Sequence, residues 1–264
     1  MVAVPCRHVR CRAAAYQRSW AEIHWTEAAI DDTNARHSDR DPLAGSSWSH
    51  PGTIAGFVRS APNEALVEVA TQEWRAPARL LDIGCGAGRN AVPLARSGWQ
   101  VVGTDLSLAM LTAAAARVAD DSLGSRLHLL LAPMEHLPLA SNSFDFVVAH
   151  GIWNLARSAA EFRGAVKEAA RVARYGAALF LFTFSRNTLP DTAEPVSGES
   201  FVFTQFSGHP QCFLTAEQVV LEMGAEGFVP DPSVPLRELN RPQGTLRTSG
   251  APVIYEGLFR CARD

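Results

Sequence analysis

Along residues 63–184, short continuous apolar runs alternate with stretches in which apolar residues recur every three or four positions. Short apolar runs bounded by glycine, proline or acidic residues are typical of buried strands, whereas apolar residues three and four apart are typical of amphipathic helices. Strands that alternate with helices predict an α/β fold, with a mostly parallel sheet and helices on both faces. The expected strands are Leu80–Ile83, Gln100–Thr104, Leu127–Leu131, Phe144–Ala149 and Ala177–Phe184, with helical patterns at 63–74, 89–96, 107–118 and 162–172.

The regions outside this alternation differ in composition. Residues 1–60 are predicted to form an N-terminal cap or lid segment, and residues 61–264 the main domain. Within that domain, residues 185–250 carry an irregular insertion expected on the substrate side, because a long loop inside a compact domain usually has a function. The remaining expected elements are a helix from the capping box of Thr215 and Gln218 through 223, and two last strands at 227–229 and 252–261.

Length, charge and cysteine content limit the class of protein. The 264 residues carry 24 basic and 27 acidic side chains, a net charge of −3, which gives no electrostatic footprint for nucleic acid. No apolar run approaches the roughly 20 residues of a membrane span, and residues 1–18 lack a secretory signal. The five cysteines are odd in number and scattered, which favours reduced thiols and a cytoplasmic location. Cys6, His8 and Cys11 lack a second ligand pair, so we expect no metal site.

The stretch Leu80–Asn90 carries the strongest local signal. An apolar strand leads into three glycines at alternating positions, Gly84, Gly86 and Gly88, and a helix follows. Such a turn lets main-chain N–H groups face a polar or anionic ligand without a Cβ in the way. A dinucleotide fingerprint requires a small residue where this chain has Arg89, and the lysine and hydroxyl residue of a phosphate-binding P-loop are absent. A turn without a ligand is the alternative.

This stretch resembles the S-adenosylmethionine (SAM) motif of class I methyltransferases, in which an acidic residue, here Asp82, precedes G-x-G-x-G. The resemblance implies a Rossmann-like, seven-stranded and mostly parallel sheet with helices on both faces and an antiparallel last strand. It also implies SAM as the cofactor and S-adenosyl-L-homocysteine (SAH) as its product. The cofactor side of the site is then expected to include Asp82, Gly84, Cys85, Gly86, Gly88, Asn90, Leu106 and Met110.

Asp105 ends the second expected strand, 17 residues beyond Gly88. That offset is close to the one at which an acidic residue bonds a ribose diol. An ionised carboxylate can accept hydrogen bonds from both hydroxyls at once, which a neutral amide does less strongly. Asp105 is therefore a candidate cofactor residue, and an acidic residue that begins a loop by chance is the alternative.

Residues 132–138, followed by Ser143-Phe144-Asp145, resemble the family's adenine-side motif. The usual aspartate that accepts from the adenine amine falls on Pro133, which has neither a side-chain acceptor nor an N–H. The resemblance implies that Met134 covers the adenine face. It leaves open whether Glu135 takes over the contact with the amine.

His150 and Trp153 follow the expected strand 144–149, at the edge of the sheet where open α/β folds bind ligands. His150 is a candidate to contact the cofactor and to hold or deprotonate a nucleophile, with His50 and His209 as other candidate bases. Trp153 is a candidate wall beside the sulfonium through cation–π attraction. A hydrogen-bonded structural histidine and a core tryptophan are the alternatives.

Further substrate contacts are expected from the loop before the main domain and from the tail. Trp48 and His50 lie on that loop. The tail is similar to that of tellurite-resistance-type methyltransferases, which carry a related Glu-Leu-His-Arg run, although the histidine is replaced here by Asn240. Arg241, also a candidate catalytic residue, and Arg247 are candidate clamps for a negatively charged substrate. Solvated surface arginines are the alternative.

Together these features predict a SAM-dependent methyltransferase that moves a methyl group to the oxygen, nitrogen, sulfur or chalcogen atom of a small-molecule acceptor by in-line displacement. A nucleic-acid methyltransferase and a non-catalytic SAM-binding subunit are the alternatives, and a nicotinamide enzyme is the least favoured. The expected partner is the small-molecule acceptor, with no nucleic acid and no membrane. Pairing into a homodimer is left open.

Overall fold

The computed structural model describes residues 41–76, 78–241 and 251–263. Of the predicted N-terminal segment 1–60, the structure therefore describes the part from Asp41 onward. The candidate residue Arg247 lies outside the described residues.

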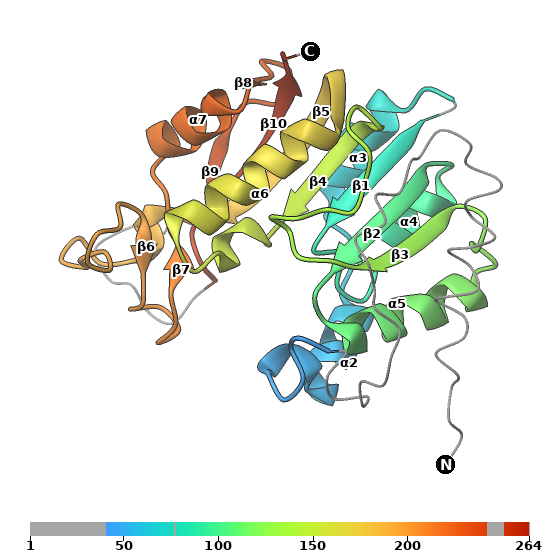
Figure 1. The fold of residues 1–264 in the computed structure, drawn as a ribbon, viewed down its shortest axis with the longest axis horizontal. Coiled ribbons are helices and arrows are strands. Elements are labelled where there is room, and N and C mark those ends of the chain that lie inside the picture. Colours follow the sequence, from blue (N-terminus) through green and yellow to red (C-terminus); the bar gives the residue numbers. More distant parts are fainter. Residues whose placement is uncertain (1–40, 77, 242–250, 264) are drawn as a thin grey trace.

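A sheet of eight strands organises the described part of the chain (Figure 1). The strand order is β3-β2-β1-β4-β5-β10-β8, in which β1 to β5 are parallel and β10 is antiparallel to its neighbours. The predicted fold class is confirmed, and the strand beyond the expected seven is β9, which pairs along the first half of β10. The strands are β1 Arg79–Ile83, β2 Gln100–Asp105, β3 Leu127–Leu131, β4 Phe144–His150, β5 Ala173–Phe184, β8 Phe228–Pro230, β9 Arg237–Leu239 and β10 Ile254–Cys261.

Two groups of helices cover the two faces of this sheet. Side chains of α3, α4 and α5 share one apolar cluster with Leu80, and side chains of α6 and α7 share the other with Leu81, because neighbouring strand residues face opposite sides. Ser107 caps α5, and both bonds of the predicted capping box at Thr215 are present at α7. The helices are α2 Pro51–Arg59, α3 Glu64–Glu73, α4 Ala91–Arg96, α5 Leu108–Asp120, α6 Ala159–Val172 and α7 Ala216–Ala225.

The carboxyl ends of the parallel strands meet at one edge of the sheet. The chain runs from β1 outward to β2 and β3, and then returns to β4 on the other side of β1, so the strand order reverses between β1 and β4. Ligands of open α/β sheets bind at such a switch point. The glycine turn after β1, Asp105 at the end of β2 and His150 at the end of β4 all lie at this edge.

Residues 185–214, for which the sequence predicts an irregular stretch, contain two short strands and an apolar cluster. Two short strands, β6 Val202–Phe203 and β7 Gln211–Cys212, form an antiparallel pair. A bridge between Ser185 and Leu214 closes the base of the insertion next to β5. A separate apolar cluster fixes it, made of Leu189, Ala193, Phe203 and Phe213.

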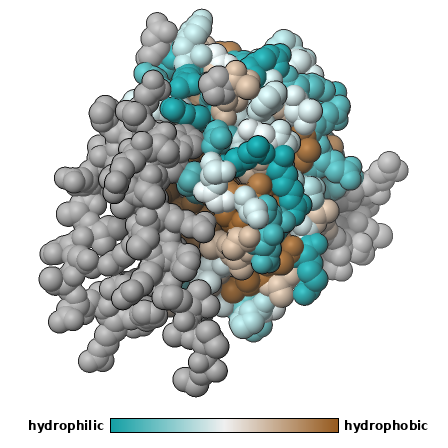
Figure 2. Space-filling model, turned by 90° about the vertical axis from the view of Figure 1, so that its right-hand side faces the viewer, coloured by the Kyte–Doolittle hydropathy of each residue, from teal (hydrophilic) through white to brown (hydrophobic). Residues whose placement is uncertain are grey.

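The surface seen in Figure 2 is largely hydrophilic where the structure describes it, with smaller hydrophobic areas between the polar residues. The exposed large hydrophobic side chains come from several elements, among them Leu131 on the edge strand β3.

Within the described ranges, no helix has the length and apolar character that a membrane crossing needs. The same ranges contain no group of three or more His, Cys, Asp or Glu side chains arranged to hold a metal ion.

Candidate active site

The glycine turn between β1 and α4 follows a main-chain path that favours glycine. The φ angles of Gly84, Gly86 and Gly88 are +70°, +53° and +76°, all in the left-handed region. A Cβ on Gly84 would lie 2.6 Å from the side chain of Ile152, just after β4. The turn is therefore in close contact with the segment that carries His150 and Trp153.

Asp105 joins the end of β2 to this turn. Its Oδ2 accepts from the Gly86 N–H at 2.9 Å, and its Oδ1 accepts from the Ser107 N–H at 2.8 Å. Burial raises the pKa of Asp105, and the hydrogen bonds from these two main-chain groups act in the opposite direction. Each carboxylate oxygen has two acceptor positions, so both oxygens keep capacity for the hydroxyls of a ribose. The residues present fit the sugar of a nucleoside cofactor.

Asp82, the acidic residue before the turn, is 2% exposed. Burial raises the pKa of Asp82 to about 7, although the charge of Arg89 acts to lower it. Its Oδ2 has no hydrogen-bond partner among the described residues. A buried acceptor left without a partner costs about 1–3 kcal/mol. This oxygen is therefore a candidate contact for a donor group of a ligand, which also fits a cofactor that carries an ammonium group.

The other predicted cofactor residues contribute less directly. A Cβ on Gly103 would lie 2.8 Å from Cys85 Sγ, so the Cys85 side chain packs onto β2 beneath the turn. Asn90 Oδ1 accepts from the Asn63 N–H at 3.0 Å and so ties the start of α3 to the turn. The cofactor roles of these side chains remain predictions, as do those of the half-buried Leu106 and Glu135 and the buried Met110 and Met134.

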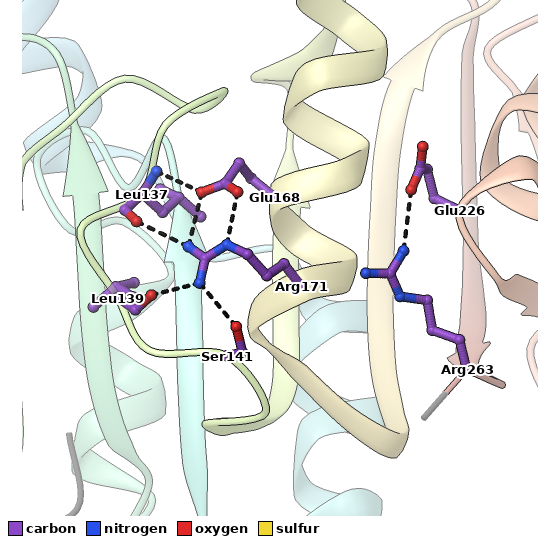
Figure 3. Close-up of polar contacts among 7 residues, drawn as sticks. All are labelled: Leu137, Leu139, Ser141, Glu168, Arg171, Glu226 and Arg263. Atoms are coloured by element: carbon purple, nitrogen blue, oxygen red, sulfur yellow. Dashed lines mark hydrogen bonds and ion pairs between the residues drawn. The ribbon is translucent and has the colours of Figure 1, made fainter. Parts of the chain in front are cut away.

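The loop between β3 and β4, which carries the residues predicted for the adenine side, is held by α6 (Figure 3). Arg171 donates to the carbonyls of Leu137 and Leu139 at 2.9 and 2.7 Å, and Glu168 accepts from the Leu137 N–H at 2.8 Å. Arg171 and Glu168 also form an ion pair at 2.7 Å. One arginine thus fixes both the loop main chain and its own partner carboxylate.

His150 is the centre of a polar cluster with Arg89, Asn63 and Glu256, which we call the His150 cluster. Arg89 Nη2 lies 2.9 Å from His150 Nδ1, and Asn63 Nδ2 lies 3.1 Å from His150 Nε2. The Asn63 amide also donates to Glu256 Oε2 at 2.7 Å. The imidazole stacks on Phe182 with ring centroids 4.2 Å apart. The cluster connects α3, the glycine turn, β4 and β10.

Burial and the charge of Arg89 lower the pKa of His150 to about 3, so the imidazole is neutral. A neutral imidazole has one acceptor nitrogen. Two donors face it, because Asn63 Oδ1 already accepts from the Leu66 N–H at 2.8 Å and this leaves the amide nitrogen toward the ring. His150 can therefore satisfy only one of them at a time. A group with this pKa is a weak base, and this argues against the predicted role of His150 as a general base. That role remains a prediction.

The N-terminal candidates Trp48 and His50 lie at the start of α2, whose Phe57 packs against the glycine turn. Trp48 is half-buried and meets Phe57 edge-on, with centroids 6.0 Å apart. A Cβ on Gly86 would lie 3.5 Å from Phe57, so α2 packs against the turn, and a lid role for the N-terminal segment remains a prediction. His50 is exposed, and its Nδ1 caps α2 by accepting from a main-chain N–H at 3.2 Å.

Trp153 is fully buried and meets Phe162 of α6 edge-on at 6.1 Å. A role for Trp153 beside the sulfonium remains a prediction. Arg241 is exposed and pairs with Glu238 at 3.4 Å. Its role as a substrate clamp remains a prediction, and Arg247 lies beyond the described ranges.

Sequence reasoning missed several polar residues at this edge. Glu238 accepts from Ser185 Oγ at 2.5 Å and from Asn187 Nδ2 at 2.7 Å, beyond the end of β5. Asn63 and Glu256 lie 193 positions apart in sequence, so no local pattern could have paired them. Arg89 was also missed as a site residue, since the sequence marks it only as the residue that breaks the dinucleotide pattern.

Known proteins share both the sequence pattern and the architecture of this region. Residues 81–181 match the family model described as a methyltransferase domain. A demethylmenaquinone methyltransferase of Corynebacterium urealyticum is 34% identical over 116 residues, which are 44% of this chain and 45% of that protein. The matched part of the chain thus spans slightly less than half of that relative.

Two solved structures share the fold. A SAM-dependent methyltransferase of Methanosarcina mazei superposes with a TM-score of 0.59 at 19% identity, over 75% of this chain and 98% of that one. A 1,6-didemethyltoxoflavin-N1-methyltransferase of Burkholderia thailandensis, with bound 1,6-didemethyltoxoflavin and SAH, gives 0.56 at 15% identity, over 99% and 94%. These likenesses concern the fold alone.

The strand order, the glycine turn and the carboxylate at the end of β2 define a class I methyltransferase fold. Within this fold, residues 81–181 carry the sequence pattern of the methyltransferase domain family.

Proposed function

We propose that this protein transfers a methyl group from SAM to a small-molecule acceptor at the carboxyl edge of the sheet. The observation that carries the proposal is the hydrogen bond between Asp105 and Gly86 inside a G-x-G-x-G turn. It places a carboxylate beside main-chain N–H groups at the switch point between β1 and β4, where a nucleoside is bound in α/β folds.

When bound, SAM supplies a methyl group attached to a positively charged sulfur. The nucleophilic atom of the acceptor forms a bond to the methyl carbon while the carbon–sulfur bond breaks and leaves its electron pair on sulfur. A proton carried by the nucleophile is released to solvent or to a base. Such a displacement mainly requires alignment of the two reactants and exclusion of water.

The chain's own residues fit these requirements. Asp105 would hold the sugar, and α2, whose Phe57 packs against Gly86, would limit access of water to the turn. His150, neutral and at the end of β4, would border the nucleophile of the acceptor, which would have to displace Arg89 or Asn63 to bond with the imidazole. The net charge of −3 favours a small acceptor over nucleic acid.

The substrate class draws support from the comparisons. The relative from Corynebacterium urealyticum is named as acting on a demethylmenaquinone, and the Burkholderia thailandensis neighbour as acting on a small heterocycle. We propose a small-molecule acceptor, in the cytoplasm, for this chain.

Binding of SAH to the Asp105→Asn variant tests the proposal. We expect titration calorimetry to show an affinity at least about tenfold lower than that of the unaltered protein, since a charge-assisted pair with the ribose is lost. The matched control is Asp120→Asn at the exposed end of α5, which should bind SAH normally. Equal affinity of Asp105→Asn and the unaltered protein would refute the ribose role.

Transfer itself is measured with methyl-labelled SAM and mixtures of phenols, amines, thiols and heterocycles. Label appearing in an acceptor supports the proposed activity. Binding of SAH without label transfer to any acceptor would instead support a SAM-binding subunit. Salt-dependent binding of RNA would support a nucleic-acid methyltransferase.

A further inference from the structure

A row of side chains crosses the carboxyl edge of the sheet next to the glycine turn. Residues directly opposite in neighbouring strands share a face. His150 of β4 is opposite Phe182 of β5, Phe182 is opposite Glu256 of β10, and Glu256 is opposite Arg237 of β9. This inner row is therefore mostly polar and ends at the His150 cluster.

A second row lies two residues further along β5, on the same face, because side chains alternate along a strand. Phe184 of β5 is opposite Ile254 of β10, and Ile254 is opposite Leu239 of β9. This outer row is entirely apolar. Over two residues along β5, this face of the sheet thus changes from mostly polar to apolar.

The insertion extends the apolar side with a further aromatic ring. Phe206 meets Phe184 edge-on, with centroids 5.5 Å apart, and also meets the fully buried Phe213 at 5.7 Å. Its position is therefore fixed by packing, although it lies on the exposed tip of the insertion. Phe206 remains 46% exposed.

Phe182 and Phe184 share one face of β5, Phe182 stacks on His150, and Phe184 meets Phe206, so the three rings form a row, which we call the aromatic strip. Phe182 and Phe184 are half-buried. Single exposed aromatic residues are normal on protein surfaces and need no explanation. Here, however, the three rings follow one another in a row that leads from the candidate site of methyl transfer to the insertion on its substrate side.

We propose that the acceptor is a flat, largely apolar ring compound that lies along this aromatic strip, with a hydroxyl or amino nucleophile at His150. This inference rests on the proposed function. Aromatic side chains favour flat partners, because ring faces and edges attract each other in offset and edge-to-face arrangements. The apolar outer row suits the body of such a compound, and the polar inner row suits its reactive group. Few well-placed polar groups in a mostly apolar site are typical of small-molecule pockets.

A matched pair of probes tests the inference on the full chain saturated with SAH. The probes are 2-naphthol and decahydro-2-naphthol, which share a hydroxyl and a two-ring skeleton, while only the first is flat and aromatic. We expect calorimetry to give an affinity for 2-naphthol about fivefold higher or more, in line with the strength of aromatic pairs. An apolar surface without ring preference would favour the saturated probe, which is the more hydrophobic one.

Two variants locate the binding. Phe206→Ala and Phe206→Leu should both weaken 2-naphthol binding about threefold to tenfold, since leucine restores apolar area but no ring. Neither should change the affinity for SAH. The control is Leu221→Ala on α7, where an equally apolar side chain is 70% exposed away from the strip, and it should change nothing.

The outcomes separate this inference from the proposed function. Equal binding of the two probes, or 2-naphthol binding that Phe206→Ala leaves unchanged, would overturn the aromatic strip as the acceptor site while SAH binding persists. If the protein fails to bind SAH at all, the proposed function itself is wrong.

Discussion

The two halves of the candidate site are built in different ways. The cofactor half consists of one short segment, residues 82–90, together with Asp105, and its contacts are made largely by the main chain. The acceptor half is assembled from side chains of α3, β4, β5, β10 and the insertion. The first half can be specified by a local motif, whereas the second exists only once distant segments have packed together.

The halves also differ in what burial does to their ionisable groups. In the cofactor half, burial raises the pKa of Asp82 to about 7 and leaves one of its oxygens without a partner among the described residues. In the acceptor half, burial lowers the pKa of His150 to about 3, and two donors compete for one ring nitrogen. The cofactor half thus lacks a hydrogen-bond donor for Asp82 Oδ2, whereas the acceptor half has one hydrogen-bond donor more than His150 can accept from.

The largest effect is expected from Gly84→Ala in the cofactor half. The new Cβ would meet three atoms of Ile152 at 2.6–2.7 Å on a backbone with φ of +70°. We expect SAH binding to be lost and the free energy of unfolding to fall by about 3 kcal/mol or more. The control is Gly176→Ala, where φ is +76° but nothing lies within 4 Å. That change should cost only about 1–2 kcal/mol. Similar losses for both variants in denaturant unfolding would contradict a close contact at Gly84.

Asp82→Asn should change how stability depends on pH. The folded protein keeps the Asp82 proton up to about pH 7, whereas the unfolded chain releases it near the ordinary aspartate pKa of 3.8. Stability therefore falls as pH rises through this window, by a few kcal/mol, since each pKa unit corresponds to about 1.36 kcal/mol. The asparagine variant should lack this fall when unfolding is measured from pH 4 to pH 8. An unchanged slope would show that Asp82 is ionised in the fold.

His150→Asn should reveal the opposite sign in the acceptor half. With its pKa at about 3 in the fold and an ordinary value of 6.5, His150 binds its proton more readily in the unfolded chain. Its contribution is fully present above pH 6.5 and is lost as pH falls toward 3. Removing the imidazole should therefore flatten the acid side of the stability profile. A profile that stays as steep in His150→Asn would contradict a neutral, buried imidazole.

A smaller effect is expected from the arginine that fixes the loop between β3 and β4. Figure 3 draws Arg171, with four partners, beside Arg263, which pairs with Glu226 alone in that view. Arg171→Gln should lower the free energy of unfolding by about 1–3 kcal/mol, because it frees buried carbonyls of the loop. Arg263→Gln should cost at most about 1 kcal/mol, as for an exposed pair. Faster hydrogen exchange at Leu137 in the first variant alone would support the anchoring role, and equal exchange in both would oppose it.

The smallest effect on stability is expected at Arg241. Its side chain is 69% exposed and pairs with Glu238 at 3.4 Å. Such pairs contribute about 0–1 kcal/mol. Arg241→Ala should leave the unfolding midpoint nearly unchanged, so a raised KM for an anionic acceptor would identify a clamp. An unchanged KM would leave Arg241 as a surface residue.

Much of the fold could be predicted because its signals are local. The apolar runs located β1 to β4 to within one residue at each end, and the glycine turn identified the carboxyl edge. Asp105 could be singled out because a strand end and a fixed offset both point to it. Its contact with Gly86 then agrees with that position, while its role toward a cofactor stays a prediction.

The acceptor half could not be predicted in the same way. Asn63 reads in sequence as an ordinary helix cap, which it also is, since Oδ1 accepts from Leu66. Glu256 reads as a polar residue of a last strand, and Phe206 as part of an irregular loop. Strand register or packing between segments places each of these residues in the site. Strand register and packing produce no periodic pattern or fixed spacing that could be recognised in the sequence.

The thiol beneath the glycine turn offers a way to observe that turn directly. Cys85 is 5% exposed, its Sγ is packed against β2, and burial raises its pKa well above the ordinary value. In the closed turn it should be inert to alkylating reagents, because only an accessible thiolate reacts readily. The rate at which an alkylating reagent labels Cys85 would therefore measure how often the turn opens locally. Ligands that stabilise the closed turn should lower this labelling rate.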